Sequence, residues 1–170
     1  MSRPQASEYP TSYEQYISLV NGDNVIKVLE EQTLSIRAVL SSVDEDMEDH
    51  SYAPGKWTIK EVIGHIIDTE RVVGYRVLRY VRGDESILPG FDSDMYVKNG
   101  NFSRRSLYDL AHEFSYVRGA NIALFKTFDN LDLEKKGTAD GKQASVRALL
   151  YMIAGHTEHH IKILRSKYLV

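Results

Sequence analysis

Hydrophobic residues recur at three- and four-residue steps in four long segments of the chain, and this spacing is typical of helices with one apolar face. The first such segment predicts a helix from about Asn24 to Val43, with Asp23 at its N-cap. Its apolar positions are Val25, Val28, Leu29, Ile36, Val39, Leu40 and Val43. A shorter helix over residues 11–20 is expected before it and ends at Asn21-Gly22.

The second predicted helix has the clearest start signal in the sequence. Thr58 and Glu61 form a T-x-x-E capping box directly after the Pro54-Gly55 turn. Gly83 provides a natural end for this helix. A helix of about 25 residues between these signals would be about 37 Å long.

The third helix is expected from Ser103, as its cap, to about Phe128, and the fourth from Ser145 to about Tyr168. The inward residues of the third are Leu107, Leu110, Phe114, Val117, Leu124 and Phe128. Turn-forming residues dominate the long connection 84–101, and such connections are usually functional or wrap over the body of a domain. The polar connection 129–143 is expected to hold a hairpin or an irregular loop.

Four long helices without a convincing strand predict an all-α fold, a four-helix bundle. A chain of 170 residues without internal repeats fits one domain. We therefore predict a single domain over 1–170, in which residues 1–12 form a loosely ordered N-terminal extension.

Composition narrows the functional classes. The hydrophobic fraction of 42% and the charged fraction of 26% are those of a soluble globular protein. A net charge of -3 without a basic patch argues against nucleic-acid binding. The absence of cysteine excludes disulfides, thiolate metal sites and a cysteine nucleophile. The start of the chain does not resemble a signal peptide and no apolar run is long enough for a membrane span, so we expect a cytoplasmic protein.

Histidines cluster in "GHTEHHIKIL", residues 155–164, where the fourth helix is otherwise apolar on one side. His156 and His160 are four residues apart, so both lie on the inward face, while His159 falls at its edge. His65 lies between Val62 and Ile66 on the inner side of the second helix. If these two helices are neighbours, His65, His156 and His160 can bind one divalent metal ion and leave a coordination position for water or substrate.

The alternative is that these histidines bind no metal, since histidine pairs with H-x-x-x-H spacing are also common on helix surfaces. His50 and His112 are expected to be surface or packing residues. Thr157 occupies the place where H-E-x-x-H metalloproteases have glutamate, which argues against that class.

Several charged residues are further candidates. Asp68 is either an acceptor that orients an imidazole or a solvated helix charge. Asp92 and Asp94 are expected to anchor the long loop, and Glu158 is expected to be exposed. A basic run on the second helix can bind carboxylates of a cosubstrate, but exposed charge is the expected role; it comprises Arg71, Arg76, Arg79 and Arg82.

Three stretches in this order resemble the DinB/YfiT-like family. They are "APGKWTIKEVIGHIIDTERVVGYRVLRYVRGD", "LPGFDSDMYV" and "HTEHHIKIL", and the likeness covers about Tyr13 to Leu164. The resemblance implies a bundle with an up-down-down-up course and a divalent metal, often zinc or nickel, on three histidines that match His65, His156 and His160. The chain departs from the family in having Ile161-Lys162-Ile163 where relatives commonly carry Gly-Gln.

Two functions follow from these observations. The first is a metal-dependent enzyme acting on a small molecule, as a hydrolase or as an S-transferase; related families use a low-molecular-weight thiol such as mycothiol, bacillithiol or glutathione. The second is a non-catalytic module, in which the metal serves stability or sensing and the functional surface is a dimer face. The 11 tyrosines suit such an interface, and we expect a homodimer.

Overall fold

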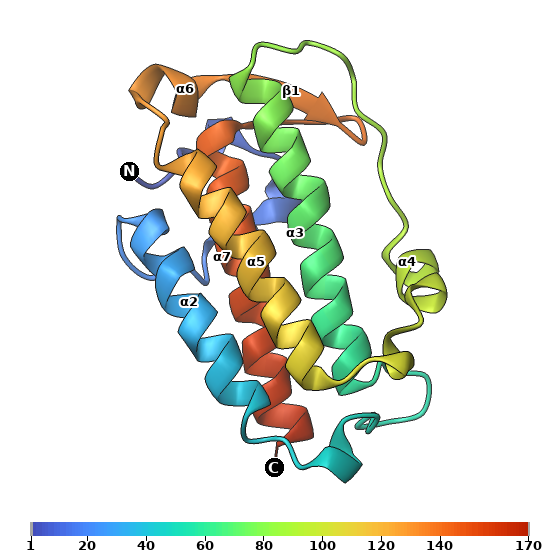
Figure 1. The fold of residues 1–170 in the computed structure, drawn as a ribbon. Coiled ribbons are helices and arrows are strands. Elements are labelled where there is room, and N and C mark those ends of the chain that lie inside the picture. The colour runs from blue at the N-terminus through green and yellow to red at the C-terminus, as the bar shows by residue number, and fades with distance from the viewer. Residues whose placement is uncertain (1, 170) are drawn as a thin grey trace.

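Four long helices form a bundle in the computed structural model, which describes residues 2–169 (Figure 1). They are α2 (Val25–Leu40), α3 (Ile59–Val81), α5 (Leu107–Phe125) and α7 (Val146–Ile163). Helices α2 and α7 run in one direction, and α3 and α5 run in the other. Both α2 and α3 pack against α5 and α7. The predicted all-α bundle with an up-down-down-up course is therefore confirmed.

Local sequence signals set most of the helix ends. The Thr58 hydroxyl accepts from the backbone N–H of Glu61, and the Glu61 carboxylate accepts from that of Thr58 at 2.8 Å, which confirms the capping box. Ser145 caps α7 as expected, and α7 continues into a π-helical turn, Leu164–Tyr168. Two predicted caps are wrong by one and three residues, because Asn24 caps α2 and Ser106 caps α5.

The connections contain short elements. The long crossover from α3 to α5 includes α4 (Ser93–Gly100), and Asp92 is its N-cap. The connection from α5 to α7 contains α6 (Asn130–Glu134) and a hairpin of β1 (Lys136–Ala139) and β2 (Lys142–Ser145). Its turn residues, Asp140 and Gly141, have φ values of 54° and 68°, as a two-residue type I′ turn requires. The hairpin was one of the two expectations for this segment.

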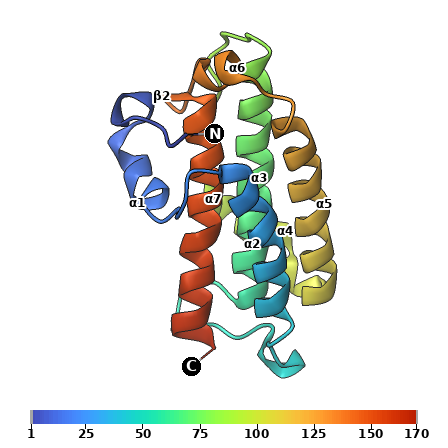
Figure 2. The ribbon, with the colours of Figure 1, turned by 90° about the vertical axis from the view of Figure 1, so that its left-hand side faces the viewer.

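The N-terminal segment lies against the side of the bundle (Figure 2). It contains two 3₁₀ turns, Ala6–Glu8 and Thr11–Tyr13, followed by α1 (Glu14–Ile17), so the helix predicted over 11–20 is shorter than expected. The Arg3 guanidinium donates to the carbonyl oxygens of Ile17 at 2.7 Å and Val20 at 3.1 Å. The segment predicted as a loosely ordered extension thus contacts the element that packs on α7.

A layer of polar side chains divides the core of the bundle. One apolar cluster fills the end of the bundle that holds the hairpin, and a second fills the end that holds the α2–α3 connection. Between them, each long helix contributes buried polar residues; they are Gln32, His65, Thr69, Glu70, Arg118, His156, Thr157 and His160. No helix among residues 2–169 combines the length and apolar character of a membrane span.

Candidate metal centre

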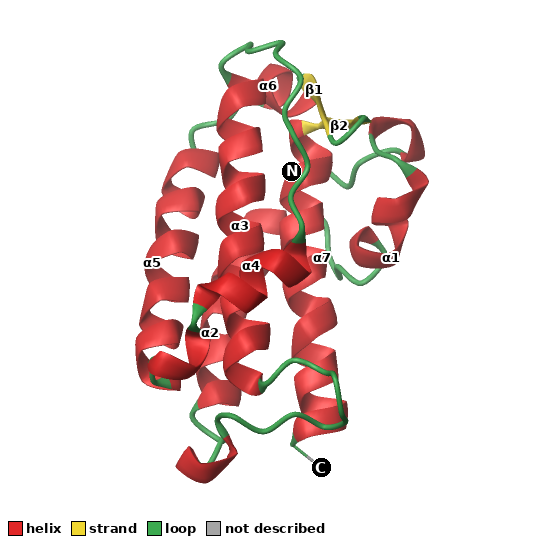
Figure 3. Cartoon of the chain, turned by 90° about the vertical axis from the view of Figure 1, so that its right-hand side faces the viewer, coloured by secondary structure: helices red, strands yellow, loops and turns green. Residues whose placement is uncertain are grey.

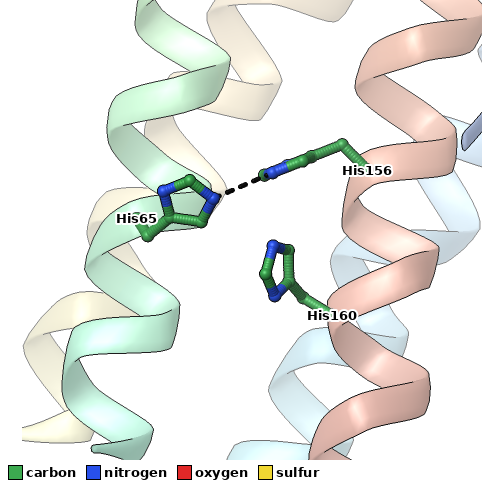
Figure 4. A group of neighbouring side chains, drawn as sticks. All are labelled: His65, His156 and His160. Carbon is green, nitrogen blue, oxygen red and sulfur yellow. Dashed lines mark hydrogen bonds between the residues drawn. The ribbon is translucent and has the colours of Figure 1, made fainter. Parts of the chain in front are cut away.

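Neighbouring helices α3 and α7 bring the three predicted histidines together (Figure 4). His65 lies on α3, about two turns after the N-cap Thr58, and His156 and His160 occupy successive turns of α7. The Nε2 atoms of His65 and His156 are 2.9 Å apart, so one ring donates a hydrogen bond to the other. Nitrogen atoms from all three rings lie within 4.8 Å of one another, close enough for one ion to contact all three.

Burial keeps these imidazoles neutral. Loss of solvent lowers the pKa of His65 to about 4 and that of His160 to about 3. The pKa of His156 also lies well below its usual range, because of burial and because of the neighbouring rings. Asp94 opposes part of the shift at His65. Neutral imidazole is the form that binds a metal ion, so at neutral pH each ring is ready to act as a ligand.

One hydrogen-bonding atom of this cluster has no partner in the described chain. The Nδ1 atom of His160 is buried and makes no hydrogen bond with any residue of 2–169. A buried polar atom without a partner costs free energy, and such atoms are rare in folded proteins. The unpartnered Nδ1 of His160 lies in the same cluster as the Nε2 atoms of His65 and His156, which face each other. This arrangement of ring nitrogens fits a cluster that binds an ion.

Aromatic side chains surround the cluster. The Trp57 ring lies 4.7 Å from that of His65, and the Tyr16 ring lies 5.5 Å from those of both His156 and His159. The Tyr168 hydroxyl donates to the Trp57 carbonyl at 2.6 Å, and burial raises its pKa to about 12. The π-helical turn after α7 therefore places Tyr168 where its hydroxyl binds the backbone of Trp57, and the Trp57 ring packs beside His65.

A cavity of about 410 Å³ opens beside His160. Three aromatic residues line it, namely Tyr52, Trp57 and Tyr168, and its charged lining residues are Lys56 and Asp94. Ile163, in the segment where the chain departs from its relatives, also lines the cavity. His160 thus connects the histidine cluster to a space that can hold a small molecule.

The other sequence candidates have different positions. Asp68 has no hydrogen bond to an imidazole within residues 2–169; burial raises its pKa, and its charged neighbours are Arg71 and Glu113. Asp92 caps α4, as loop anchoring requires, whereas Asp94 faces the cavity. His159 is half-buried at the edge of the cluster.

Two further histidines lie outside the cluster, as expected. The ring of His112 packs between Tyr108 and Tyr116, and that of His50 contacts Tyr168. The expectation of exposed charge for the basic run on α3 is wrong for one of its residues, because Arg76 is only 6% exposed.

Sequence reasoning missed the buried ion pair next to the histidines. The fully buried Arg118 of α5 donates to both carboxylate oxygens of Glu70 on α3, at 2.6 and 2.8 Å. It also donates to Thr157, the residue after His156, at 3.0 Å, and to Gln32 on α2 at 3.3 Å. A signal was present, because Arg118 lies one turn after the inward Phe114.

The fold and the histidine cluster together define a class of protein: a four-helix bundle with one histidine on the second long helix and a histidine pair on the last. The chain belongs to the DinB superfamily, whose family model matches residues 29–164. No curated protein matches the sequence.

A solved structure has a similar fold. It is described as YfiT from Bacillus subtilis, a probable metal-dependent hydrolase with an unusual four-helix bundle topology. The match covers 95% of this chain and 91% of that one, with a TM-score of 0.75 and 16% sequence identity. At this level of identity, the likeness establishes the fold.

Proposed function

We propose that the protein is a metal-dependent enzyme that uses a divalent ion bound by His65, His156 and His160. The observation that supports this most directly is the meeting of three buried, neutral imidazoles, one of which borders a cavity. Imidazole ligands suit zinc and nickel among other divalent ions. Three protein ligands leave a coordination position for a reactant, which is the usual arrangement of a catalytic site.

The chemistry follows from the residues around the cluster. A divalent ion lowers the pKa of a bound water or thiol and polarises a substrate oxygen, so it supports hydrolysis or transfer to a thiol. Because the chain contains no cysteine, a thiol in the transfer reaction must come from a cosubstrate. The description of YfiT as a probable metal-dependent hydrolase favours hydrolysis.

The cavity indicates a small-molecule substrate. Its aromatic side chains can hold a flat or apolar group next to His160, while Lys56 and Asp94 offer charges of opposite sign for polar groups. Trp57 contacts His65 and lines the cavity, so it shields one side of the cluster from water. A homodimer and a cytoplasmic location remain predictions.

Metal analysis of purified protein tests the proposal. We expect about one equivalent of divalent metal by elemental analysis after loading and desalting, and loss of most of it in His160→Ala. His159→Ala is the matched control, because this neighbouring histidine is half-buried and outside the three-histidine group. The control is expected to keep its metal.

Folding must be followed in the same samples. Circular dichroism that is unchanged in His160→Ala, with the metal lost, supports a reactive centre. Unfolding on metal loss would instead support a structural role in a non-catalytic module. If wild-type protein stays metal-free after loading with zinc and with nickel, the proposal is wrong.

A further inference from the structure

Helix α4 and the segment that leads to it lie over α3 (Figure 3). Residues of these elements line a second cavity, of about 310 Å³. Its walls are mainly apolar and aromatic, formed by Val72, Tyr75, Leu88, Pro89, Phe91 and Tyr96. Its cationic residues are Arg71 and Arg76. None of the three clustered histidines lines it, and Arg76 lies about 16 Å further along α3 than His65, at 1.5 Å per residue.

Arg76 is buried at this cavity without an acidic partner. Only 6% of it is exposed, and within residues 2–169 no carboxylate oxygen lies within 4.0 Å of its guanidinium. Its Nη2 donates to the Pro89 carbonyl at 3.0 Å, and its guanidinium lies 5.9 Å from the centre of the Phe91 ring. No other hydrogen bond of this guanidinium joins it to the described chain.

Two acidic residues near this cavity are paired with other cations. Glu113 binds Arg71 at 2.6 Å and also binds Arg105. Asp140, which lies beside Gly90, pairs with Lys142 at 3.0 Å. Residues 2–169 therefore place no counter-charge within 4.0 Å of the Arg76 guanidinium.

The other buried arginine of the described residues, Arg118, has both a counter-charge and several hydrogen-bond acceptors. Arg118 has a two-oxygen contact with Glu70 and further acceptors on Leu29, Gln32 and Thr157. A buried charge normally has such partners, because removing it from water is costly. At Arg76, by contrast, a single carbonyl of the described residues accepts a hydrogen bond, from Nη2, and the remaining N–H donors are accessible to solvent.

We propose that this cavity is a binding site for a small aromatic carboxylate, with the carboxylate on Arg76. A guanidinium and a carboxylate match in geometry and can form two parallel hydrogen bonds. The rings of Tyr75, Phe91 and Tyr96 provide surfaces for a flat apolar group. A cavity of about 310 Å³ suits a molecule with a single ring.

Binding of phenylacetate tests the site. We would titrate the full-length protein with phenylacetate in the presence of a chelator, so that no metal ion can bind the carboxylate, and follow amide shifts by NMR. The neutral counterpart, phenylacetamide, is the ligand control. Phenylacetate is expected to shift amides of α3 and of residues 88–96, and to bind at least about tenfold more tightly than the amide, since a charged hydrogen-bonded pair contributes more than a neutral one.

Variants separate this site from other surfaces. Arg76→Met removes the charge, and Val72→Phe fills the cavity from a half-buried position while Arg76 stays in place. Arg82→Met is the matched control, because Arg82 is exposed near the end of the same helix. Each of the first two variants should weaken phenylacetate binding at least about tenfold, and the control should not change it.

The Val72→Phe result decides the matter if Arg76→Met does not fold. Failure of wild-type protein to bind phenylacetate, equal affinity for the amide, or full affinity in folded Val72→Phe would each overturn the proposal. None of these outcomes bears on the histidine cluster, because its residues are unchanged.

Discussion

At the residue scale, the buried histidines make the metal-free protein sensitive to acid. An unfolded histidine has a pKa of about 6.5, whereas His65 and His160 are lowered to about 4 and about 3 when folded. Between these values the unfolded chain binds more protons, so the free energy of unfolding falls as the pH falls below about 6.5. We expect a loss of about 2 kcal/mol for each of these histidines between about pH 7 and about pH 5.

Urea denaturation of the chelated protein at both pH values measures this loss. His160→Gln keeps a polar side chain without a titrating group, so its free energy of unfolding should depend less on pH. His112→Gln, at a site outside the cluster, should behave like wild type. An equal pH dependence in His160→Gln and wild type would contradict the expectation.

Polar residues that fall on the apolar face of a helix can be recognised from the sequence, and the three histidines meet this criterion. The same criterion applied to Arg118 and Arg76 would have marked them, but long cationic side chains usually reach solvent from such positions. Their burial depends on what covers them. Glu70, Gln32 and Thr157 cover Arg118, and the crossover segment around Pro89 covers Arg76.

At the element scale, α1 approaches α7 at a glycine. A Cβ atom on Gly155 would lie 2.0 Å from the backbone oxygen of Tyr16, so α1 can pack here only because this residue has no side chain. The contact also carries the Tyr16 ring to His156. The position of the helix and the surroundings of the histidine cluster are therefore linked.

Replacement of this glycine should destabilise the protein. Alanine normally favours a helix over glycine by about 1 kcal/mol, but in Gly155→Ala we expect a net loss of about 1–3 kcal/mol from the clash with α1. Gly119→Ala on α5 is the matched control, because nothing lies within 4 Å of its added Cβ, and it should stabilise the protein by about 0.5–1 kcal/mol. Thermal unfolding measures both, and a stabilised Gly155→Ala would show that α1 is not held closely to α7.

Helix boundaries illustrate a limit of local signals. Ser103 and Ser106 are both acceptable N-caps for α5, and the sequence offers no strong reason to choose between them. The Phe102 ring lies where a Cβ on Gly64 would be, at 2.3 Å, so the chain around Phe102 is fitted to α3. Residues 102–104 form a 3₁₀ turn there, and the helix starts after Ser106.

At the scale of the whole molecule, the ion pair of Arg118 and Glu70 joins the bundle at its centre. Arg118 on α5 contacts residues of α2, α3 and α7, and Gln32 on α2 also donates to the Ala154 carbonyl of α7 at 2.8 Å. These directional contacts exist only when each helix has its observed neighbours and its observed position along the bundle axis. They therefore align His65 on α3 with His156 and His160 on α7.

Glu70→Gln should be strongly destabilising, by about 3–5 kcal/mol, because it leaves a buried guanidinium without its counter-charge. The double variant Glu70→Gln/Arg118→Met removes that charge as well, so we expect it to be more stable than Glu70→Gln alone. Chemical denaturation of both proteins measures the difference. If Glu70→Gln costs less than about 1 kcal/mol, the ion pair does not stabilise the core as described.

The sequence alone determined the number and approximate extent of the long helices, the caps of α3 and α7, and the three histidines on inward faces, because these depend on periodicity and on neighbours within one or two turns. Only the tertiary structure decided that α3 and α7 are adjacent, that Arg118 and Arg76 are buried, and that Tyr168 and Asp94 border the cavity beside His160. These properties depend on contacts between residues far apart in the chain, and a helical pattern specifies which face is buried but not what it meets.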